Sequence, residues 1–376
     1  MFLFRRIFRD AAFFCIYNVC LLTYQINSYT VGMDSIALYR KYRPTDFASV
    51  RGQEHVVSVL KSSADSGRPA HAYLFAGGRG TGKTSMARIL AKALNIHDKD
   101  IYEIDAASNR QVEAARELRE GVATSPFESK YKLYILDEVH MLTKEAFNTL
   151  LKTLEEPPVH ALFVLATTEI DRVPDTIQSR CQVFHFKKPS SEILRNLVLD
   201  VAKAEGAKIS PASAEIIALM GDGSFRDTLG MLQKVLSSGL NPTDAEVSAV
   251  LGAPRGTAVG EFLSAIARAD AGEAINIFHR MFSDGVDAKT FMMLLIARTR
   301  AVLLLRYSQD SEMKERIVQQ FGQDVMTELV RLSGKEGARI NSGVLASLID
   351  ALLDMNRAPI PQIPLELAVI KICEAK

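Results

Sequence analysis

The chain has 376 residues, of which 48% are hydrophobic and 24% charged. This is the composition of an ordinary globular protein of two or three domains, and it excludes wholesale disorder, collagen-like repeats and low-complexity scaffolds. Basic residues exceed acidic residues by one (45 − 44 = +1), so binding of a polyanion would have to come from a local patch.

The first 32 residues differ from the rest of the chain. Three arginines precede a 14-residue apolar stretch from Ala11 to Tyr24, which is too short to cross a membrane comfortably. The charge order fits a secretory signal, but no small-x-small cleavage site follows it. An arginine-rich organelle-targeting segment and an upstream extension before a start at Met33 are the other interpretations. We expect residues 1–32 to be disordered or non-native.

The cysteines indicate the redox environment. The chain has four, and none forms a C-x-x-C pair, which argues against a zinc ribbon or a disulfide scaffold. This usage suits a reducing compartment, and we expect the protein to be cytoplasmic. The four are Cys15, Cys20, Cys181 and Cys373.

Between Arg68 and Phe186, short apolar runs alternate with helical patterns. Continuous apolar runs of this length are typical of strands buried on both faces of a parallel sheet, and the alternation predicts right-handed βαβ units. The expected strands are Ala72–Ala76, Leu133–Leu136, Leu162–Ala166 and Val183–Phe186. The expected helices are Thr84–Leu94, Gln111–Gly121 and Thr143–Glu156, the last with Thr143 as N-cap.

After Pro189 the pattern predicts helices alone. Residues 189–252 predict a small helical lid, and residues 253–376 predict a larger helical block. Its most apolar stretch, Phe291–Leu305, contains two arginines and predicts a buried helix of a bundle rather than a membrane helix. The expected division is 1–32, 33–188, 189–252 and 253–376.

A phosphate-binding motif follows the first expected strand. Residues 77–84 fit G-x-x-x-x-G-K-[ST] without a mismatch, and a helix begins there. Glycines let backbone N–H groups surround phosphate oxygens, and the helix N-terminus favours negative charge. We expect Lys83 to reach the β- and γ-phosphates and Thr84 to hold Mg²⁺. The candidate nucleotide-binding residues are Gly77, Gly78, Arg79, Gly80, Thr81, Gly82, Lys83, Thr84 and Ser85.

Acidic and hydroxyl side chains end the next two expected strands. Asp137 is placed to hold Mg²⁺ beside the P-loop, and Glu138 to polarise the attacking water. Such a pair also caps helices, but together with Lys83 it indicates hydrolysis. Thr167 and Thr168 end the following strand, where a hydroxyl can hydrogen-bond the γ-phosphate or the water, although threonine is common at strand ends.

Two arginines are candidates for neutralising charge in the transition state. Arg180 lies in Ser-Arg-Cys before the last strand, and Arg226 begins a lid helix. The alternatives are a solvated loop charge and an ordinary first-turn residue. Residues 137–140, Asp-Glu-Val-His, also fit the D-E-x-H box of helicases, but those enzymes need a second RecA-like sheet that residues 190–376 do not predict.

Further motifs surround these residues. They are Leu-Tyr-Arg-Lys-Tyr-Arg-Pro at 38–44, Gly-Gln-Glu-His at 52–55, Asp-Glu-Val-His-Met-Leu at 137–142, Leu-Lys-Thr-Leu-Glu-Glu-Pro-Pro at 151–158, Leu-Ala-Thr-Thr at 165–168, Ser-Arg-Cys at 179–181 and Gly-Ser-Phe-Arg-Asp at 223–227. Together they closely resemble the gamma/tau family of bacterial DNA polymerase III, the AAA+ ATPase motor of the sliding-clamp loader. The match is strong over residues 36–250 and only topological beyond them.

The resemblance implies an α/β fold: a five-stranded parallel sheet, a helical lid and an all-α collar that holds a pentamer together. It implies ATP and Mg²⁺ as cofactors, with Lys83 and Thr84 on the phosphates and Mg²⁺ and Asp137 on Mg²⁺. The implied catalytic groups are the base Glu138, the first sensor Thr168 (or Thr167), the second sensor Arg226, and Arg180, which acts in trans on a neighbour's ATP. Tyr39, Arg43 and Pro44 would lie near the adenine.

A DNA contact is expected at two helix starts. Amino termini of helices with interspersed basic residues suit tracking of duplex phosphates, although a solvated helix face fits equally well without the resemblance. Little aromatic interleaving occurs, which disfavours base stacking on a single strand. The candidates are Asn109, Arg110 and Gln111 on one helix, and Lys144, Lys152 and Thr153 on the other.

The sequence departs from the family in two ways. The family usually has a four-cysteine zinc module after the P-loop helix, whereas residues 95–101 lead straight to residues 102–105 without a cysteine, so we expect no zinc. The chain ends at Lys376, after the expected collar, so we expect a short, gamma-like form.

The resemblance implies an ATPase subunit that opens the sliding clamp, places it on primer–template DNA and releases it after hydrolysis. The implied partners are delta-like and delta-prime-like subunits in a hetero-pentamer, the clamp and DNA, with no membrane. Two alternatives stay open: a DNA-remodelling AAA+ motor for branch migration or recombination, and a non-catalytic scaffold subunit of the loader.

Overall fold

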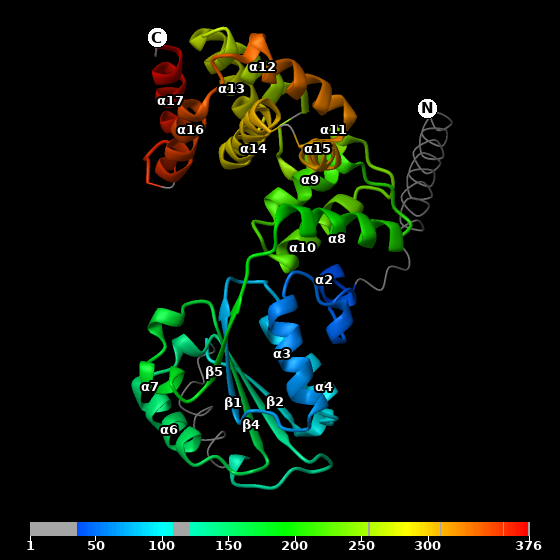
Figure 1. Ribbon diagram of the computed structural model, residues 1–376, viewed down its shortest axis with the longest axis vertical. Coiled ribbons are helices and arrows are strands. Elements are labelled where there is room, and N and C mark those ends of the chain that lie inside the picture. The colour runs from blue at the N-terminus through cyan, green and yellow to red at the C-terminus, as the bar shows by residue number, and fades with distance from the viewer. Residues whose placement is uncertain (1–35, 108–120, 255, 309, 356, 375–376) are drawn as a thin grey trace, which may run out of the picture.

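A computed structural model describes residues 36–107, 121–254, 256–308, 310–355 and 357–374. The chain forms two lobes: one contains the sheet, and the other is entirely helical (Figure 1). The short helix α2, Leu38–Lys41, lies between the lobes and packs against α10, Phe225–Leu236, of the helical lobe (Figure 1).

The sheet has five parallel strands in the order β2-β3-β4-β1-β5. Because all run in one direction, the carboxyl ends of β1, β3 and β4 share one edge of the sheet. The expected five-stranded parallel sheet is confirmed. The edge strand β2 is half-exposed, so no continuous apolar run marks it in the sequence. The strands are β1 Ala72–Gly77, β2 Ile101–Asp105, β3 Lys132–Asp137, β4 Ala161–Thr167 and β5 Gln182–Phe186.

Alternate residues of the central strands face two separate cores. Tyr73 and Phe75 of β1 pack under α3 (Glu54–Asp65) and α4 (Lys83–Ala93). Leu74 and Ala72 pack on the other face, under α6 (Lys144–Glu155) and α7 (Asp175–Gln178). The helices predicted after the P-loop and after Thr143 are therefore confirmed, and Thr143 Oγ1 caps α6 by accepting from Ala146 N at 3.2 Å. The helix predicted at Gln111–Gly121 lies almost wholly outside the described residues.

The helical lobe has one continuous hydrophobic core. Ile217, Leu251, Phe262 and Phe291 all belong to it, so the helices on either side of residue 252 pack together. The helices are α8 Ser191–Ala204, α9 Pro211–Met220, α10 Phe225–Leu236, α11 Asp244–Leu251, α12 Gly256–Ala267, α13 Ala271–Ser283, α14 Ala288–Tyr307, α15 Ser311–Ser333, α16 Ser342–Met355 and α17 Ile363–Glu374. The division into lid and collar at this residue stays a prediction.

Helix α14 contains the apolar stretch that was predicted to be buried, and it is. Phe291, Leu295 and Val302 are fully enclosed, and Arg298 is only 5% exposed. Arg298 Nη1 lies 3.6 Å from Glu328 Oε2 of α15. Burial lowers the pKa of Arg298, and the neighbouring carboxylate opposes this. Among the described residues, no helix is both long and apolar enough to cross a membrane.

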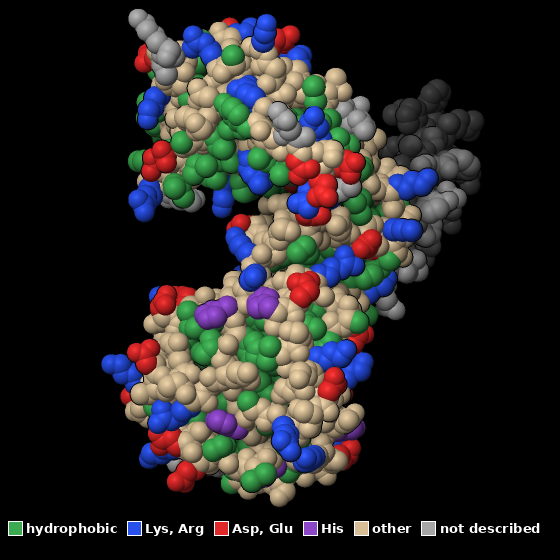
Figure 2. Space-filling model, in the orientation of Figure 1, with side chains coloured by type: hydrophobic (Ala, Val, Ile, Leu, Met, Phe, Trp, Pro, Cys, Tyr) green, Lys and Arg blue, Asp and Glu red, His purple; other side chains and the backbone are tan. Residues whose placement is uncertain are grey.

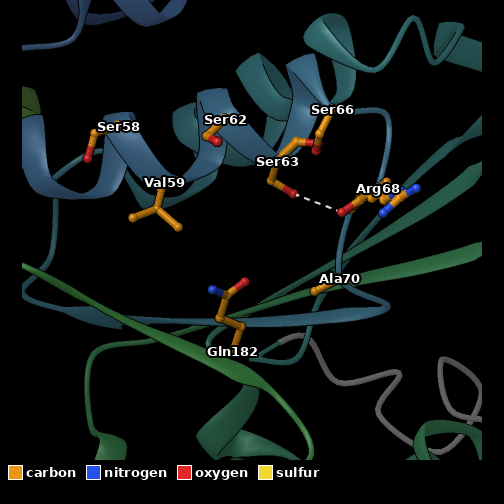
Figure 3. A pocket seen from close by; sticks show the side chains of 9 residues that line it. Ser58, Val59, Ser62, Ser63, Ser66, Arg68, Ala70 and Gln182 are labelled. Carbon is orange, nitrogen blue, oxygen red and sulfur yellow. Dashed lines mark hydrogen bonds between the residues drawn. The ribbon is translucent and has the colours of Figure 1, made fainter.

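A groove of about 540 Å³ lies between α3 and β5 (Figure 3). Ser58, Ser62 and Ser66 of α3 line one side and Gln182 the other. Gln182 begins β5, so the groove lies at the amino ends of the strands and contains none of the predicted site residues.

The described residues also form short 3₁₀ helices: η1 Phe47–Ser49, η2 Asp98–Asp100, η3 Val139–Met141, η4 Ile170–Arg172 and η5 Lys335–Gly337.

Candidate functional site

The P-loop connects β1 to α4 at the carboxyl edge of the sheet. Gly80 and Gly82 have φ values of +70° and +102°, a backbone region that favours glycine. Lys83 is 6% exposed, and its Nζ donates to the carbonyl oxygens of Gly77 at 2.7 Å and Gly78 at 2.9 Å. Thr81 Oγ1 also donates to the Gly78 carbonyl at 2.8 Å. The loop therefore curls around the lysine side chain, and the expected contacts of Lys83 with phosphates stay a prediction.

The surroundings of Lys83 bring four predicted residues together. Burial lowers the pKa of the Lys83 ammonium, and the nearby Arg226 lowers it further. The carboxylates of Glu138 and Asp137 raise it. Two cationic side chains, Lys83 and Arg226, therefore lie beside two carboxylates, Asp137 and Glu138, and this arrangement suits an anionic phosphate group that carries a bound cation.

Two oxygen ligands converge beside the P-loop. Thr84 Oγ1 donates to Asp137 Oδ2 at 2.8 Å, and Glu138 N donates to Asp137 Oδ1 at 3.0 Å. Mg²⁺ prefers oxygen ligands and usually keeps several waters or phosphate oxygens beside one or two protein groups. Thr84 and Asp137 fit that pattern. Within the described ranges, no cluster of three or more His, Cys, Asp or Glu side chains could hold a metal ion.

Glu138 is held by the end of the neighbouring strand. Its Oε2 accepts hydrogen bonds from Thr168 N at 3.3 Å and from Thr168 Oγ1 at 3.0 Å. Thr167 is fully buried, and its hydroxyl lies 2.9 Å from His140 Nδ1 instead. Of the two threonines left open as the sensor, Thr168 is therefore the one that contacts the predicted base.

The first turn of α10 contacts the P-loop directly. Phe225 N donates to the Gly80 carbonyl at 3.0 Å, and Ser224 caps α10 by accepting from Asp227 N. The Arg226 guanidinium lies 5.7 Å from the centre of the Tyr39 ring, within cation–π range. Arg226 is thus close to both the P-loop and the segment expected near the adenine.

Gly80→Ala is expected to disturb this contact. An added Cβ would lie 1.9 Å from Ser224 Oγ, at a φ of +70°. We expect about tenfold weaker ATP binding, a change of about 1.4 kcal/mol, because the start of α10 must move away from the P-loop. Gly67→Ala is the matched control, since Gly67 has a φ of +63° and no atom within 4 Å. It should lower stability by about 1 kcal/mol and leave ATP affinity unchanged. An equal affinity loss in both variants would contradict the prediction.

Residues 38–44 lie between the helical lobe and α4. Tyr39 and Pro44 are half-buried, and Arg43 Nε donates to Ser85 Oγ at 2.9 Å. Burial lowers the pKa of Arg43. Its neighbour Tyr42 donates instead to Glu205 at the end of α8, and burial together with this bond raises the pKa of Tyr42 to about 12.

Arg180 contacts helices on its own side of the sheet. Its Nη2 donates to Glu155 Oε1 of α6 and its Nη1 to the Thr176 carbonyl, both at 2.7 Å, and its side chain is 34% exposed. The contacts that Arg180 makes here are with α6 and α7, and its role in trans stays a prediction. Burial raises the pKa of the adjacent Cys181 to about 12, which favours the protonated thiol.

The expected DNA face is described only in part. Lys144, Asn148 and Lys152 are exposed at intervals of four residues along one side of α6. The Thr153 hydroxyl donates back to the Thr149 carbonyl within the helix. Asn109 and Arg110, like Gln111, lie outside the described residues.

Two family models and several curated relatives match this chain, and all are subunits of DNA polymerase III. The model "DNA polymerase III, delta subunit" matches residues 52–110 and 97–190, and "DNA polymerase III subunits gamma and tau domain III" matches residues 242–376. DNA polymerase III subunit tau of Bacillus subtilis is 36% identical over 369 residues, covering 90% of this chain and 63% of the relative. The gamma/tau subunit of Mycobacterium tuberculosis is 34% identical over 366 residues, covering 90% and 62%. The chain belongs to the gamma/tau family of DNA polymerase III subunits.

This gamma/tau chain spans less than two thirds of the length of these relatives. Among solved structures, the Thermotoga maritima RuvB Holliday junction branch migration motor matches with a TM-score of 0.48 and 22% identity, covering 60% of this chain and 79% of that one. The Bacillus subtilis DNA clamp loader delta protein matches with a TM-score of 0.32 and 17% identity, covering 84% and 99%.

Three contacts of this gamma/tau site were not predicted from the sequence. They involve Ser224 against Gly80, Glu205 against Tyr42, and His140 against Thr167. Of these residues Glu205 alone lies outside the quoted motifs, and the motifs do not say which groups their side chains contact. The Ser224–Gly80 and Glu205–Tyr42 pairs join residues far apart in the chain.

Proposed function

We propose that this chain is an ATPase subunit of a replicative sliding-clamp loader. The observation that carries the proposal is the convergence at one sheet edge of Lys83, the Thr84–Asp137 pair and the Glu138–Thr168 pair. ATP binding would order the subunit assembly that opens the clamp on primer–template DNA, and hydrolysis would release the clamp. Such an enzyme works as part of the DNA polymerase III holoenzyme, in the cytoplasm.

Each side chain has a role in the proposed hydrolysis. Lys83 and the N–H groups of residues 77–85 bind the phosphates, while Thr84 and Asp137 would hold Mg²⁺, which would supply positive charge to the phosphates. Glu138 accepts the proton of the attacking water, and Thr168 keeps the Glu138 carboxylate in position. Arg226 stabilises the negative charge that develops on the γ-phosphate.

The partners we propose are further loader subunits, delta-like and delta-prime-like, in a hetero-pentamer. The helices α16 and α17 pack against each other and carry exposed apolar side chains, which supports a subunit contact there. Leu353 of α16 is 64% exposed and Leu367 of α17 is 60% exposed. Three isoleucines widen the apolar face: Ile349, Ile363 and Ile370. Figure 2 shows hydrophobic side chains gathered on this lobe over α14 and α16. Large exposed apolar patches mark protein interfaces.

We also propose that the sliding clamp and primer–template DNA are bound by the assembled loader. The Lys144–Lys152 side of α6 supports the DNA contact, because exposed lysines at helical spacing follow duplex phosphates without reading sequence. A scaffold role without catalysis is disfavoured, since every residue of the P-loop and of the acidic pair is intact.

Lys83→Ala tests the proposal most directly. Loss of a buried ammonium from the phosphate site is expected to weaken ATP binding at least about 100-fold and to abolish turnover. ATP affinity, and ATP hydrolysis with the partner subunits, clamp and primed DNA, would be measured. Lys92→Ala is the control, because Lys92 is exposed on the same helix. The proposal fails if the wild-type mixture shows no stimulation of ATP hydrolysis by primed DNA, or if Lys83→Ala binds ATP normally.

A further inference from the structure

His140 is the buried histidine of the carboxyl edge. It lies in η3, two residues after Glu138, and its side chain is 5% exposed. The roles proposed above for Lys83, Asp137, Glu138 and Thr168 do not use it. A buried polar ring at this position requires hydrogen-bond partners, and the partners it has are all near the predicted base.

Both ring nitrogens of His140 face polar groups at the ends of β3 and β4. Nδ1 lies 2.9 Å from Thr167 Oγ1 and 3.5 Å from Glu138 Oε2. Nε2 lies 3.4 Å from Glu169 Oε1. The Thr167 hydroxyl also accepts from Glu169 N at 3.0 Å, so this one oxygen contacts both the imidazole and the turn. The imidazole thereby fixes the backbone turn of residues 167–169.

That turn determines where Glu138 points. The Glu138 carboxylate contacts Thr168, which belongs to the turn, and lies 3.5 Å from Nδ1 of the imidazole. Glu138 has a left-handed backbone with φ of +49°, which its own side chain does not favour. Its carboxylate direction therefore depends on how firmly the turn is held.

We propose that His140 is a positioning residue for ATP hydrolysis: through Thr167 it holds Thr168, and through Thr168 it sets the Glu138 carboxylate. This inference rests on the proposed ATPase function. It differs from a role in packing alone, in which a buried histidine fills space and its loss lowers stability without a specific effect on turnover.

The experiment compares kcat, KM for ATP, ATP affinity and thermal stability in the assembled loader with primed DNA. His140→Leu is expected to lower kcat about tenfold, with KM and ATP affinity changed less than twofold. His140→Asn, which returns a polar atom near Nδ1, should recover part of the loss. His160→Leu is the matched control, because His160 is a half-buried histidine at the other end of β4 whose Nε2 contacts the Val122 carbonyl at 3.1 Å. It should lower thermal stability and leave kcat unchanged.

Thr167→Val supplies the test of coupling. It removes the hydroxyl with little change in shape and should lower kcat about as much as His140→Leu does. The double variant should then be no slower than either single variant, because both break the same link. If the kcat of the double variant fell by the product of the two single losses, or if the single variants changed KM alone, the positioning role would be overturned and the ATPase proposal would stand. Absence of turnover in the wild-type assembly would overturn both.

Discussion

Replacing Glu138 by glutamine is expected to lower kcat for ATP hydrolysis by about 1,000-fold while ATP still binds. Glutamine keeps the shape of the side chain, and its amide oxygen can still accept the two hydrogen bonds that Thr168 donates to Glu138 Oε2. What it loses is the ability to take a proton from the attacking water. Because binding and turnover separate, the loader carrying Glu138→Gln should accumulate with ATP, clamp and DNA bound.

Single-turnover hydrolysis and ATP affinity measure the two parts of this prediction. Glu192→Gln serves as the control, since Glu192 is an exposed carboxylate in the first turn of α8. It should change neither quantity. Normal turnover by Glu138→Gln would remove Glu138 from its role as base, and loss of ATP binding would show that the substitution disturbs the pocket.

The sheet was predictable where its strands are enclosed. β1, β3 and β4 are buried along almost their whole length, so each one is a continuous apolar run in the sequence. β2 is an edge strand whose residues are half-exposed or exposed, and its sequence Ile-Tyr-Glu-Ile-Asp has no such run. Only the family resemblance supplied the fifth strand. Burial on both faces therefore strengthens the signal in the sequence, although the other edge strand, β5, was predicted from Val183–Phe186 while partly exposed.

The site was predictable where its residues are adjacent in the chain. The P-loop lies within eight residues, and its glycines, lysine and threonine have roles that follow from local geometry. By contrast, Tyr42 and Glu205 are 163 positions apart, and Gly80 meets Ser224 only because α10 returns to the P-loop. Another hydroxyl or carboxylate of the helical lobe could make these contacts, so the spacing of residues along the chain does not predict which residues pair.

Residues 38–43 connect the helical lobe to helix α4. Leu38 is buried in the core of the helical lobe and its N–H donates to Gln233 Oε1 at 3.0 Å. Arg43, five residues later, donates to Ser85 on α4. Residues 38–43 therefore contact both the helical lobe and α4, and we propose that a movement of the helical lobe on ATP binding would be transmitted through this segment.

Arg180→Ala is expected to lower ATP hydrolysis by about 1,000-fold in the assembled loader, the effect typical of a lost arginine finger. Its guanidinium contacts Glu155 and the Thr176 carbonyl within its own chain, and the target that we propose for it is ATP held by a neighbouring subunit. ATP affinity should change much less than kcat, because the arginine acts on charge that develops in the transition state. Glu155→Gln is the control: it releases Arg180 without removing it and should not slow turnover.

Mixing two inactive variants decides whether Arg180 acts in trans. Arg180→Ala chains keep an intact P-loop, and Lys83→Ala chains keep an intact Arg180. In an assembly that contains both variants, some interfaces place the intact P-loop of an Arg180→Ala chain against the intact Arg180 of a Lys83→Ala chain. Hydrolysis should therefore recover to a substantial fraction of the wild-type rate. If Arg180 acted on ATP bound by its own chain, no pairing of these variants would give a complete site, and the mixture would stay as inactive as its components.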